Sequence, residues 1–557
     1  MEKNNLFWII LLTAVFFAAY FVGINAPIQE VDPATYAEVS REMVASRNYI
    51  FLHDNYRDYL DKPPVTMWLI SASYLLFGIT NFAVRLPSVL MALVALMAVY
   101  WLGLMLWNKR SGLLAALLFA SAAAPRLMIQ DPKIDMVLIG LMSLSFALLY
   151  RGLSDHRFLW PGYAAMALAF LTKGPISIGI PVLAFGAYAF WKHDSSVIKR
   201  LKPVRGLLLT AALILPWYLA VALRRGDYTA YFMLFKQSFG RFYAHQFNYG
   251  GNDLFYVHTF AWAFFPWTWL FLTLLVQRVF AWRKGIKPDD GELFALWWWI
   301  LPFIILSLAI SKLPQYIFWL LPPAALLTGH WLDKRLEQGV SARESKVLSV
   351  QYLFIALPLI LIAVMFLISF PPATALPWGI LGAGCAVLLA FAVSMKTGIK
   401  KIVVLSAVSM VVFDVLFSGY LYPAVLKYQP FQVFGKQIRE LAHDRKSVIL
   451  SYRYGERGTL NYYSRMPVRQ VDTPQEINRY LAVHNPSFFV TTDNLVKQLG
   501  AMGYTVTVIN SLPFYPTSRM DRCFVLKWDR DKCLTHLTIG TISGTAGETV
   551  SAPSADR

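Results

Sequence analysis

The residues of this sequence that could carry out chemistry are acidic and basic side chains beside long apolar segments. Asp32 follows the first apolar run and lies where a helix is predicted to begin. Asp61 and Lys62 precede a double proline, and Asp131 lies in another short connection. Ionisable groups this close to a bilayer are costly, which makes them candidates for function. A carboxylate can act as a base or bind a metal, and a lysine can bind phosphate.

Each of these residues also has a purely structural interpretation. Asp32 could cap its helix by accepting hydrogen bonds from first-turn amides, and Asp131 and Asp135 could be caps as well. Lys62 could extend its ammonium group to lipid headgroups. A further set in other connections would consist of interface anchors if each member acted alone: Lys173, Arg241, His245, Lys312 and Tyr316. Together these side chains form a basic face opposite carboxylates, which suits a lipid phosphate, with or without a divalent cation.

The elements that must position these residues are membrane helices. The chain has 557 residues, of which 57% are hydrophobic and only 15% are charged, and its mean hydropathy is +0.49. Soluble proteins are usually about 45–50% apolar. The net charge of +19 would suggest a nucleic-acid partner in a soluble protein. In a membrane protein, positive loops set the orientation instead, so we expect no nucleic-acid partner.

The sequence predicts about thirteen membrane-spanning helices, because long apolar runs recur and each can cross about 30 Å of hydrocarbon. Several runs are short for a full crossing. The predicted spans are residues 6–24, 83–106, 112–125, 134–150, 158–172, 176–191, 206–223, 258–280, 293–310, 316–331, 350–370, 376–395 and 402–422.

Alternate connections between these spans are basic, which predicts the orientation. The connection after the sixth span carries five cations, namely Lys192, Lys199, Arg200, Lys202 and Arg205. The connection 371–375 on the opposite side carries none. The positive-inside rule then places the N-terminus in the cytoplasm, and an odd number of spans places the C-terminal region outside.

The predicted domain organisation follows from this topology. Residues 1–422 form the transmembrane domain, with long outer loops at 25–82 and 224–257. Residues 64–78 of the first loop are expected to lie along the interface. Residues 423–537 form an outer α/β domain with a strand expected at 523–528, and the Gly/Ser/Thr-rich residues 538–557 form a disordered tail. Cys523 and Cys533 could form a disulfide if that side is oxidising.

Known nucleotide and hydrolase motifs are absent from the sequence. It contains no GxxxxGK[ST] loop, no GxGxxG after a strand, and no HExxH, GxSxG or CxxC motif. Nucleotide-driven transport and the use of nucleotide sugars are therefore unsupported. A transporter or flippase of lipid-linked glycans is an alternative class, but it should show paired halves with broken helices, and no such repeat is evident.

An ordered series of short motifs resembles the GT-C glycosyltransferases, and in particular the aminoarabinose transferases. Asp32 precedes Tyr36-Ala37-Glu38, as in the first outer loop of that superfamily. The superfamily also includes protein O-mannosyltransferases. The other motifs follow in the expected order over residues 1–330: Lys62-Pro63-Pro64 with Trp68-Leu69, Arg85-Leu86-Pro87-Ser88, Asp131-Pro132, Lys173-Gly174-Pro175, Pro216-Trp217, Gly240-Arg241-Phe242, Phe265-Pro266-Trp267, and Ser311-Lys312 with Tyr316.

This resemblance implies a multi-pass protein of the bacterial inner membrane that acts at its periplasmic face. It would be an inverting transferase whose donor is a sugar on undecaprenyl or another polyprenyl phosphate. Asp32 would be the catalytic carboxylate, and Asp131 would organise the acceptor side. Asp61 and His245 would bind a divalent metal. The donor phosphate would be held by Lys62 and Arg241, with Lys173, Lys312 and Tyr316 also at the site.

The leading hypothesis for the reaction is the transfer of 4-amino-4-deoxy-L-arabinose to a phosphate of lipid A. The alternative within the same class is transfer of another lipid-linked sugar, such as a hexose or mannose, to lipopolysaccharide, another glycan or protein. In either case the partners would be the lipid-linked donor, an acceptor at the membrane face and the surrounding lipids.

Overall fold

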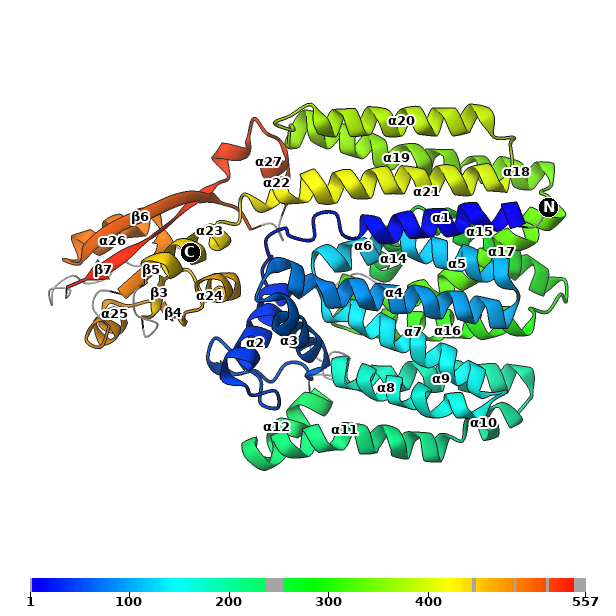
Figure 1. The fold of residues 1–557 in the computed structure, drawn as a ribbon, viewed down its shortest axis with the longest axis horizontal. Helices are drawn as coiled ribbons and strands as arrows, with labels where there is room; N and C mark the ends of the chain where they lie inside the picture. The colour runs from blue at the N-terminus through cyan, green and yellow to red at the C-terminus, as the bar shows by residue number, and fades with distance from the viewer. Residues whose placement is uncertain (1–2, 237–253, 443–446, 485–486, 517–519, 545–557) are drawn as a thin grey trace.

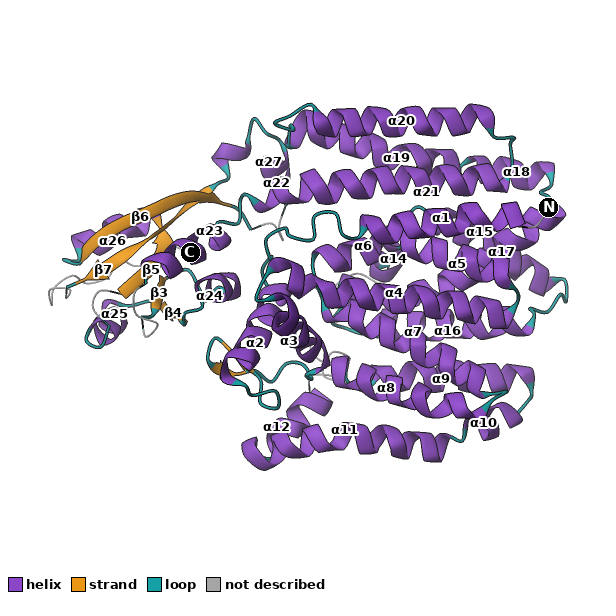
Figure 2. Ribbon diagram, in the orientation of Figure 1, coloured by secondary structure: helices purple, strands orange, loops and turns teal. Residues whose placement is uncertain are grey.

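The computed structural model describes residues 3–236, 254–442, 447–484, 487–516 and 520–544. Figure 1 shows a bundle of roughly parallel helices with a sheet domain at one end, which we call the domain end. The N-terminus lies at the opposite end, which we call the N-terminal end. Figure 2 shows that the long strands all belong to the sheet domain, whereas the bundle is helical. The protein is therefore a polytopic helical membrane protein with a C-terminal α/β domain, as predicted.

A helix covers each of the thirteen predicted apolar stretches. Within the described residues, seven helices are long and apolar enough to cross a membrane, or eight if the bent pair α5 and α6 is one span. The helices over the stretches as far as the second long loop are α1 (Lys3–Ala19), α4 (Asn81–Leu106), α5 (Lys109–Ser121), α6 (Ala123–Gln130), α7 (Ile134–Gly152), α8 (Leu159–Lys173), α9 (Ile176–Lys192), α10 (Ser196–Leu201) and α11 (Pro203–Arg225). After that loop come α14 (Phe255–Ala263), α15 (Thr268–Arg283), α16 (Asp290–Leu308), η3 (Pro314–Leu320), α17 (Leu321–Gln338), α18 (Ala342–Ser349), α19 (Gln351–Val364), η4 (Met365–Ser369), α20 (Leu376–Ser394), α21 (Ile399–Leu416), η5 (Phe417–Leu421) and α22 (Tyr422–Leu426).

Two predicted spans are broken, and the breaks contact each other. α5 and α6 meet at an angle of 49°, and Phe265-Pro266 separates α14 from α15. Proline lacks the amide hydrogen that a continuous helix needs. The amide of Ala123 donates to the carbonyl of Phe265 at 3.0 Å, and Trp267 Nε1 donates to Ser121 Oγ at 2.9 Å. Each break therefore supplies polar groups to the other, which is how irregular backbone is tolerated at membrane depth.

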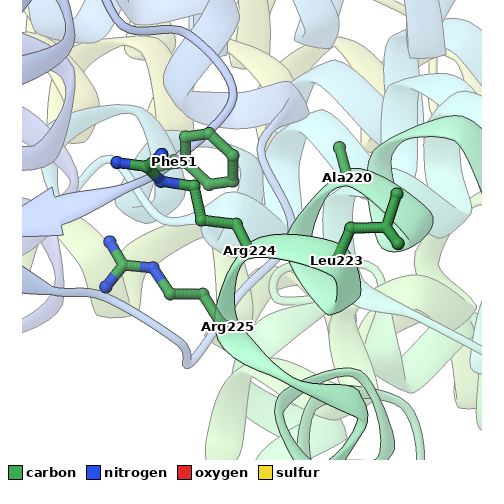
Figure 3. A pocket seen from close by; sticks show the side chains of 5 residues that line it. All are labelled: Phe51, Ala220, Leu223, Arg224 and Arg225. Carbon is green, nitrogen blue, oxygen red and sulfur yellow. The ribbon is translucent and has the colours of Figure 1, made fainter.

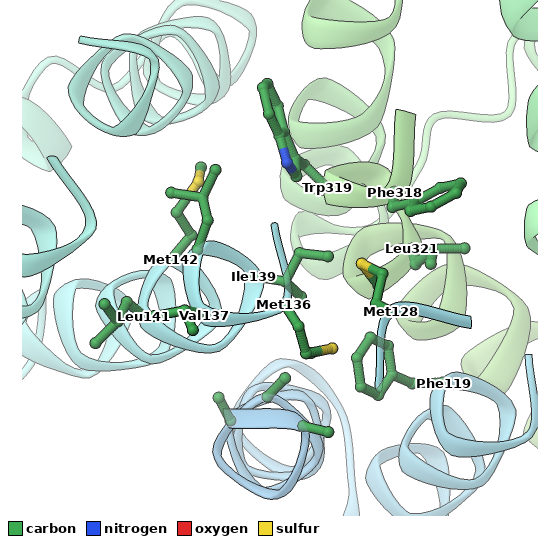
Figure 4. Close-up of a cluster of buried hydrophobic side chains, with 14 of the residues drawn as sticks. Phe119, Met128, Met136, Val137, Ile139, Leu141, Met142, Phe318, Trp319 and Leu321 are labelled. Carbon is green, nitrogen blue, oxygen red and sulfur yellow. The ribbon is translucent and has the colours of Figure 1, made fainter. Parts of the chain in front are cut away.

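A buried apolar cluster lies beneath the connection that carries Asp131. Figure 4 shows Phe119 of α5, Met128 of α6, Met136 of α7 and Phe318 of η3 converging in it. Phe119 and Met136 are fully buried. This cluster packs helices on both sides of the connection 131–133 and so fixes its position at the domain end.

The first long loop folds at the domain end, between α1 and α4. It contains α2 (Asp32–Ser46), the two-residue strands β1 (His53–Asp54) and β2 (Arg57–Asp58), and α3 (Val65–Phe77). The chain that enters α2 is held by Arg85 of α4, which is completely buried. Its guanidinium donates to the carbonyls of Ala26 at 2.6 Å and Pro27 at 2.9 Å, and to Gln130 at 3.0 Å.

The C-terminal domain is a five-stranded mixed sheet in the order β4-β3-β5-β7-β6. β3 pairs in parallel with β4 and β5, and β7 is antiparallel to β5 and β6. Apolar side chains on its two faces form separate buried clusters. Its elements are α23 (Phe431–Leu441), β3 (Ile449–Tyr452), α24 (Gly458–Ser464), β4 (Val468–Val471), α25 (Pro474–Leu481), β5 (Ser487–Thr492), α26 (Asp493–Ala501), β6 (Thr505–Phe514), α27 (Arg522–Val525), η7 (Arg530–Lys532) and β7 (Thr535–Ser543).

Two predictions for this domain were wrong. The disordered tail expected at 538–557 is wrong as far as residue 543, because residues 538–543 belong to β7, where Leu537, Ile539 and Ile542 are buried. Their spacing follows a strand only loosely, and the Gly/Ser/Thr composition hid it. The stretch 523–528, expected to be a strand, instead consists of the helical turn α27 followed by a turn. Asp521 caps α27, because its side chain accepts from the amide of Phe524 at 3.0 Å.

Cys523 and Cys533 form a disulfide beside this turn, and their Cα atoms lie 6.2 Å apart. The segment that it closes rests on the end of the membrane bundle. Arg530 donates to the carbonyls of Phe524 and Ser369, and its guanidinium carbon lies 4.1 Å from the centre of the Phe370 ring. The disulfide thus closes a segment that ties the sheet domain to η4.

Candidate active site

Asp32 is the first residue of α2 and is half-buried. The cap interpretation fails, because Val31 holds the N-cap position and no side chain caps this helix. The charge of Asp32 acts on its surroundings instead. Burial raises the pKa of Tyr36 and Tyr59 well above the ordinary value, and the negative charge of Asp32 raises both further. Asp32 therefore lies beside a buried aromatic wall of the loop.

Asp131 belongs to the same electrostatic cluster as Asp32. It ends α6, and its carboxylate lies 3.4 Å from Lys133 Nζ. Burial raises the pKa of Asp131, Lys133 opposes that rise, and the charge of Asp32 adds to it. Burial disfavours the charge on Lys133, but Asp131, Asp32 and Asp135 outweigh burial and raise the pKa of Lys133. Two segments about a hundred residues apart thus place three carboxylates around one lysine.

Lys173 joins this cluster through Asp135, in the first turn of α7. The two side chains form an ion pair, and Trp319 Nε1 donates to the same carboxylate at 3.0 Å. Lys173 Nζ lies 4.5 Å from the centre of the Tyr316 ring and 4.8 Å from that of Trp319. The structure therefore brings the predicted residues Lys173 and Tyr316 together, with one side of the lysine held by a carboxylate and aromatic faces.

Asp61 and Lys62 lie between β2 and α3. Asp61 is exposed and Lys62 is half-buried, and Lys62 Nζ donates to the backbone carbonyl of Asp61 at 3.2 Å. The charge of Asp61 contributes to the raised pKa of both Tyr59 and Tyr36, as the charge of Asp32 does. These two tyrosines therefore link the Asp61-Lys62 pair to Asp32.

Of the other predicted residues, the structure describes Lys312 but not Arg241 or His245. Ser311 and Lys312 are buried between α16 and η3. Tyr256 of α14 contacts the next residue, because its hydroxyl lies 3.3 Å from both the amide and the carbonyl of Leu313. Arg241 and His245 lie outside the described residues.

The carboxylate of Asp61 could supply one oxygen ligand to a divalent cation such as Mg²⁺, which prefers oxygen ligands. The second predicted ligand, His245, lies outside the described residues. Within the ranges that are described, the groups close enough to bind a metal are elsewhere. One contains the disulfide-bonded Cys523 and Cys533, and the other is ion-paired at the N-terminal end. The described residues therefore supply one candidate oxygen ligand, Asp61, for a divalent cation at this site.

The sheet domain contacts the loop on both sides of α2. Glu30, just before α2, accepts hydrogen bonds from the amide of Thr459 at 2.7 Å and from its hydroxyl. Asn55, beyond α2, donates to the carbonyl of Val468 at 2.7 Å and accepts from its amide at 3.0 Å. The position of Asp32 thus depends on a domain more than 400 residues away in sequence.

Two residues at or beside the site carried no sequence signal. Trp319 lies in an apolar helical stretch like many others, and Thr459 lies in an ordinary soluble segment. Arg126, which follows the predicted span 112–125, is buried in α6 and donates to Ser418 Oγ at 2.5 Å and to the carbonyl of Ala19 at 2.7 Å. Arg126 therefore ties α6 to α1 and η5.

The fold and site define a class: a multi-pass membrane protein with a charged site where the bundle meets an extramembrane domain. Residues 61–219 match the family model described as dolichyl-phosphate-mannose-protein mannosyltransferase. The chain is 30% identical over 353 residues to the undecaprenyl phosphate-alpha-4-amino-4-deoxy-L-arabinose arabinosyl transferase of Erwinia tasmaniensis, covering 61% of this chain and 62% of that protein. It is 31% identical over 326 residues to the second such transferase of Proteus mirabilis, covering 57% and 58%. The chain thus matches about three fifths of the length of these relatives.

The solved structures extend the likeness to the whole fold. The crystal structure of ArnT from Cupriavidus metallidurans bound to undecaprenyl phosphate matches with a TM-score of 0.77 at 22% identity, covering 97% of this chain and 99% of that one. The predicted fold is therefore confirmed, because the chain has the fold of this ArnT structure. The relatives named above are similar in sequence to this chain and are transferases of the kind that its motifs resemble.

Proposed function

We propose that this protein is an inverting glycosyltransferase that moves a sugar from a polyprenyl phosphate to an acceptor at the membrane face. One observation carries the proposal. Asp32, Asp61, Asp131 and Lys133 act electrostatically on one another or on shared neighbours at one end of a membrane bundle. Such a site can bind an anionic donor through lysines and keep a carboxylate beside the acceptor.

The reaction would proceed by attack of an acceptor oxygen on the anomeric carbon of the donor sugar. The bond between that carbon and the phosphate oxygen breaks, and the lipid phosphate leaves with the electron pair. Lys62 and Arg241 would stabilise the charge on the leaving phosphate, because cations aimed at developing charge lower the barrier. Asp32 would orient the acceptor oxygen and accept its proton where it carries one, and Asp131 would organise the acceptor side. A divalent cation held by Asp61 would add positive charge near the phosphate.

This proposal favours a phosphate of lipid A as the acceptor and 4-amino-4-deoxy-L-arabinose as the sugar. The support is that the relatives named above are transferases of that sugar from undecaprenyl phosphate. Adding an amino sugar to a phosphate would reduce the negative charge of the outer lipid surface and so weaken its attraction for cationic peptides.

Transfer of a hexose or mannose to another glycan or to protein is the second candidate. The observation that favours it is the match of residues 61–219 to a mannosyltransferase family model.

The domain end would face the periplasm of a bacterial cell and the N-terminus the cytoplasm. Two features support this orientation. The basic connections near α10 and α18 lie at the same end as the N-terminus (Figure 1), and positive loops favour the cytoplasmic side. A disulfide near the domain end also suits an oxidising compartment.

The test is mass spectrometry of lipid A from cells with and without the gene, under conditions that supply the donor. We expect a mass increase of one amino sugar that depends on the gene and is lost in the Asp32→Asn variant. An unchanged lipid A together with a new glycan on another acceptor would favour the second candidate. An undiminished product with Asp32→Asn would rule out the catalytic role of Asp32.

A further inference from the structure

A hollow of about 700 Å³ opens at the domain end of α11, beside the loop that follows α2. Its lining consists of Phe51, Ala220, Leu223, Arg224 and Arg225. Figure 3 shows that both arginine side chains leave the same turn of α11 toward the same side, with Arg224 crossing the Phe51 ring. The hollow therefore presents two cations and an aromatic face together.

The charges in this hollow are not balanced. Arg225 pairs with Asp58, whereas no carboxylate is paired with Arg224 in the described part of the chain. The guanidinium carbon of Arg224 lies 5.1 Å from the centre of the Phe51 ring, within the range of a cation–π contact. His53 adds no cation at neutral pH, because burial and the nearby arginines lower its pKa. Among the described side chains of the hollow, two guanidiniums thus face one carboxylate, and their net positive charge would attract an anion.

An apolar stripe leads along α11 to the hollow. Leu215, Leu219 and Leu223 are 50%, 55% and 89% exposed. Residues four apart lie on one face of a helix, and in a membrane such an exposed apolar face meets acyl chains. The hollow and the stripe together fit a molecule that has an anionic head and hydrocarbon chains.

The hollow also adjoins the candidate active site. A second, smaller cavity shares Phe51 and Arg225 with it and is lined by Tyr59 and Leu60, directly before Asp61. Burial raises the pKa of Tyr59, and the charges of Asp61 and Asp32 raise it further. A headgroup bound at Arg224 would therefore lie beside the loop that carries the candidate catalytic groups.

Arginines at the C-terminus of a membrane helix can also act only as interface anchors or complement the helix dipole. That role accounts for either arginine but not for an open hollow built with Phe51. We propose that the hollow binds a phosphate group of the acceptor lipid other than the one that receives the sugar, with the acyl chains along the leucine stripe. This proposal rests on the proposed function and adds to it a headgroup site.

The test compares two acceptors, lipid A with two phosphates and its monophosphoryl form, using the full chain in phosphatidylcholine nanodiscs. Arg224→Gln should raise the KM for the two-phosphate lipid about tenfold, as expected for one lost charge-assisted contact. The KM for the monophosphoryl lipid and for the donor should not change. Arg224→Lys should retain part of the discrimination. Arg47→Gln removes an exposed arginine from the end of α2 and serves as the matched control, with no effect on either acceptor.

An equal loss for both acceptors, or no loss for either, would overturn the proposal. Inorganic phosphate should not displace the lipid, because it has no chains to lie on the stripe, and displacement would instead identify a site for free phosphate. Native mass spectrometry of lipid binding keeps the two hypotheses separate. A wild-type protein that transfers to neither lipid refutes lipid A as acceptor, whereas equal binding of the two-phosphate lipid by wild type and Arg224→Gln refutes the headgroup site.

Discussion

The two ends of the bundle each carry a cluster of carboxylates, and the described residues surround these carboxylates with donors and cations more completely at one end than at the other. At the N-terminal end, Asp289 accepts from Trp107 Nε1 at 2.9 Å and from Lys334 Nζ at 3.1 Å. Glu292 pairs with Lys334 and Arg278. At the domain end, Asp131 has Lys133 as a partner but also lies near the like charge of Asp32.

For this reason the pKa of Asp289 at the N-terminal end and the pKa of Asp131 at the domain end shift in opposite directions. Burial opposes ionisation of Asp289, but hydrogen bonds from His330, the Glu292 amide, Trp107 and Lys334 outweigh it and lower the pKa. Burial also opposes ionisation of Asp131, and there it prevails, so the pKa is raised. Charges that are fully paired stabilise a fold, whereas crowded and partly buried charges are typical of sites that do chemistry.

The largest expected effect comes from removing the charge of Asp32. Asp32→Asn should lower the rate of sugar transfer by about 10²–10⁴-fold, the usual contribution of general acid–base catalysis. Folding should be preserved, since Asp32 does not cap α2. Transfer from a labelled polyprenyl-phosphate sugar measures the rate, and a thermal unfolding scan measures the fold. Wild-type kinetics in this variant would show that the crowded cluster is not catalytic.

Weakening the contact between the sheet domain and the residue before α2 should lower the transfer rate by a smaller factor. Thr459→Val keeps the side-chain shape but removes the hydroxyl that donates to Glu30. The loss of one hydrogen bond to the buried carboxyl group of Glu30 should lower kcat roughly tenfold while leaving the donor KM unchanged. Thr459→Ser restores the hydroxyl and should restore the rate. A change confined to thermal stability would show that Thr459 holds the domain but does not position Asp32.

At the N-terminal end, the same kind of substitution should affect stability and not activity. Asp289→Asn should cost about 1–2 kcal/mol, because the carboxylate is partly exposed and solvent screens its partners. The pKa of Asp289 is lowered in the folded state, so its contribution is complete at neutral pH. It is lost as the pH falls through the ordinary aspartate range toward the folded-state value.

Thermal unfolding of wild type and Asp289→Asn across acidic and neutral pH measures this effect, with the exposed Asp531 as the control site. A loss of transfer activity in folded Asp289→Asn would contradict the division of roles between the two ends.

The smallest expected effect is a shift in pH dependence. Lys133 holds the pKa of Asp131 below the value that burial alone would give. Lys133→Met should therefore raise the pKa of Asp131 and move the acidic limb of the kcat–pH profile to higher pH. Lys427→Met removes an exposed lysine at the same end of the bundle and should leave the profile in place. An unmoved acidic limb would mean that transfer does not need ionised Asp131.

Most of the helical architecture could be predicted from the sequence, because a run of apolar residues marks a membrane helix without help from its neighbours. The breaks at Ala122 and Pro266 were harder, since each depends on polar groups supplied by the other. The strand β7 was missed for a related reason. Its Gly/Ser/Thr-rich residues resemble a disordered tail, and only pairing with β5 and β6 makes them a strand.

The sequence by itself determined that this is a membrane protein, which of its ends carries the basic connections, and which motifs resemble a sugar transferase. These properties follow from local composition and spacing. Only the tertiary structure decided that Asp32, Asp61, Asp131 and Lys173 share one neighbourhood, and that Arg126 is instead a buried tie between helices. It also decided that Thr459 contacts the residue next to α2. The physical reason is that electrostatic and hydrogen-bond partners are set by distance in space, which composition does not encode.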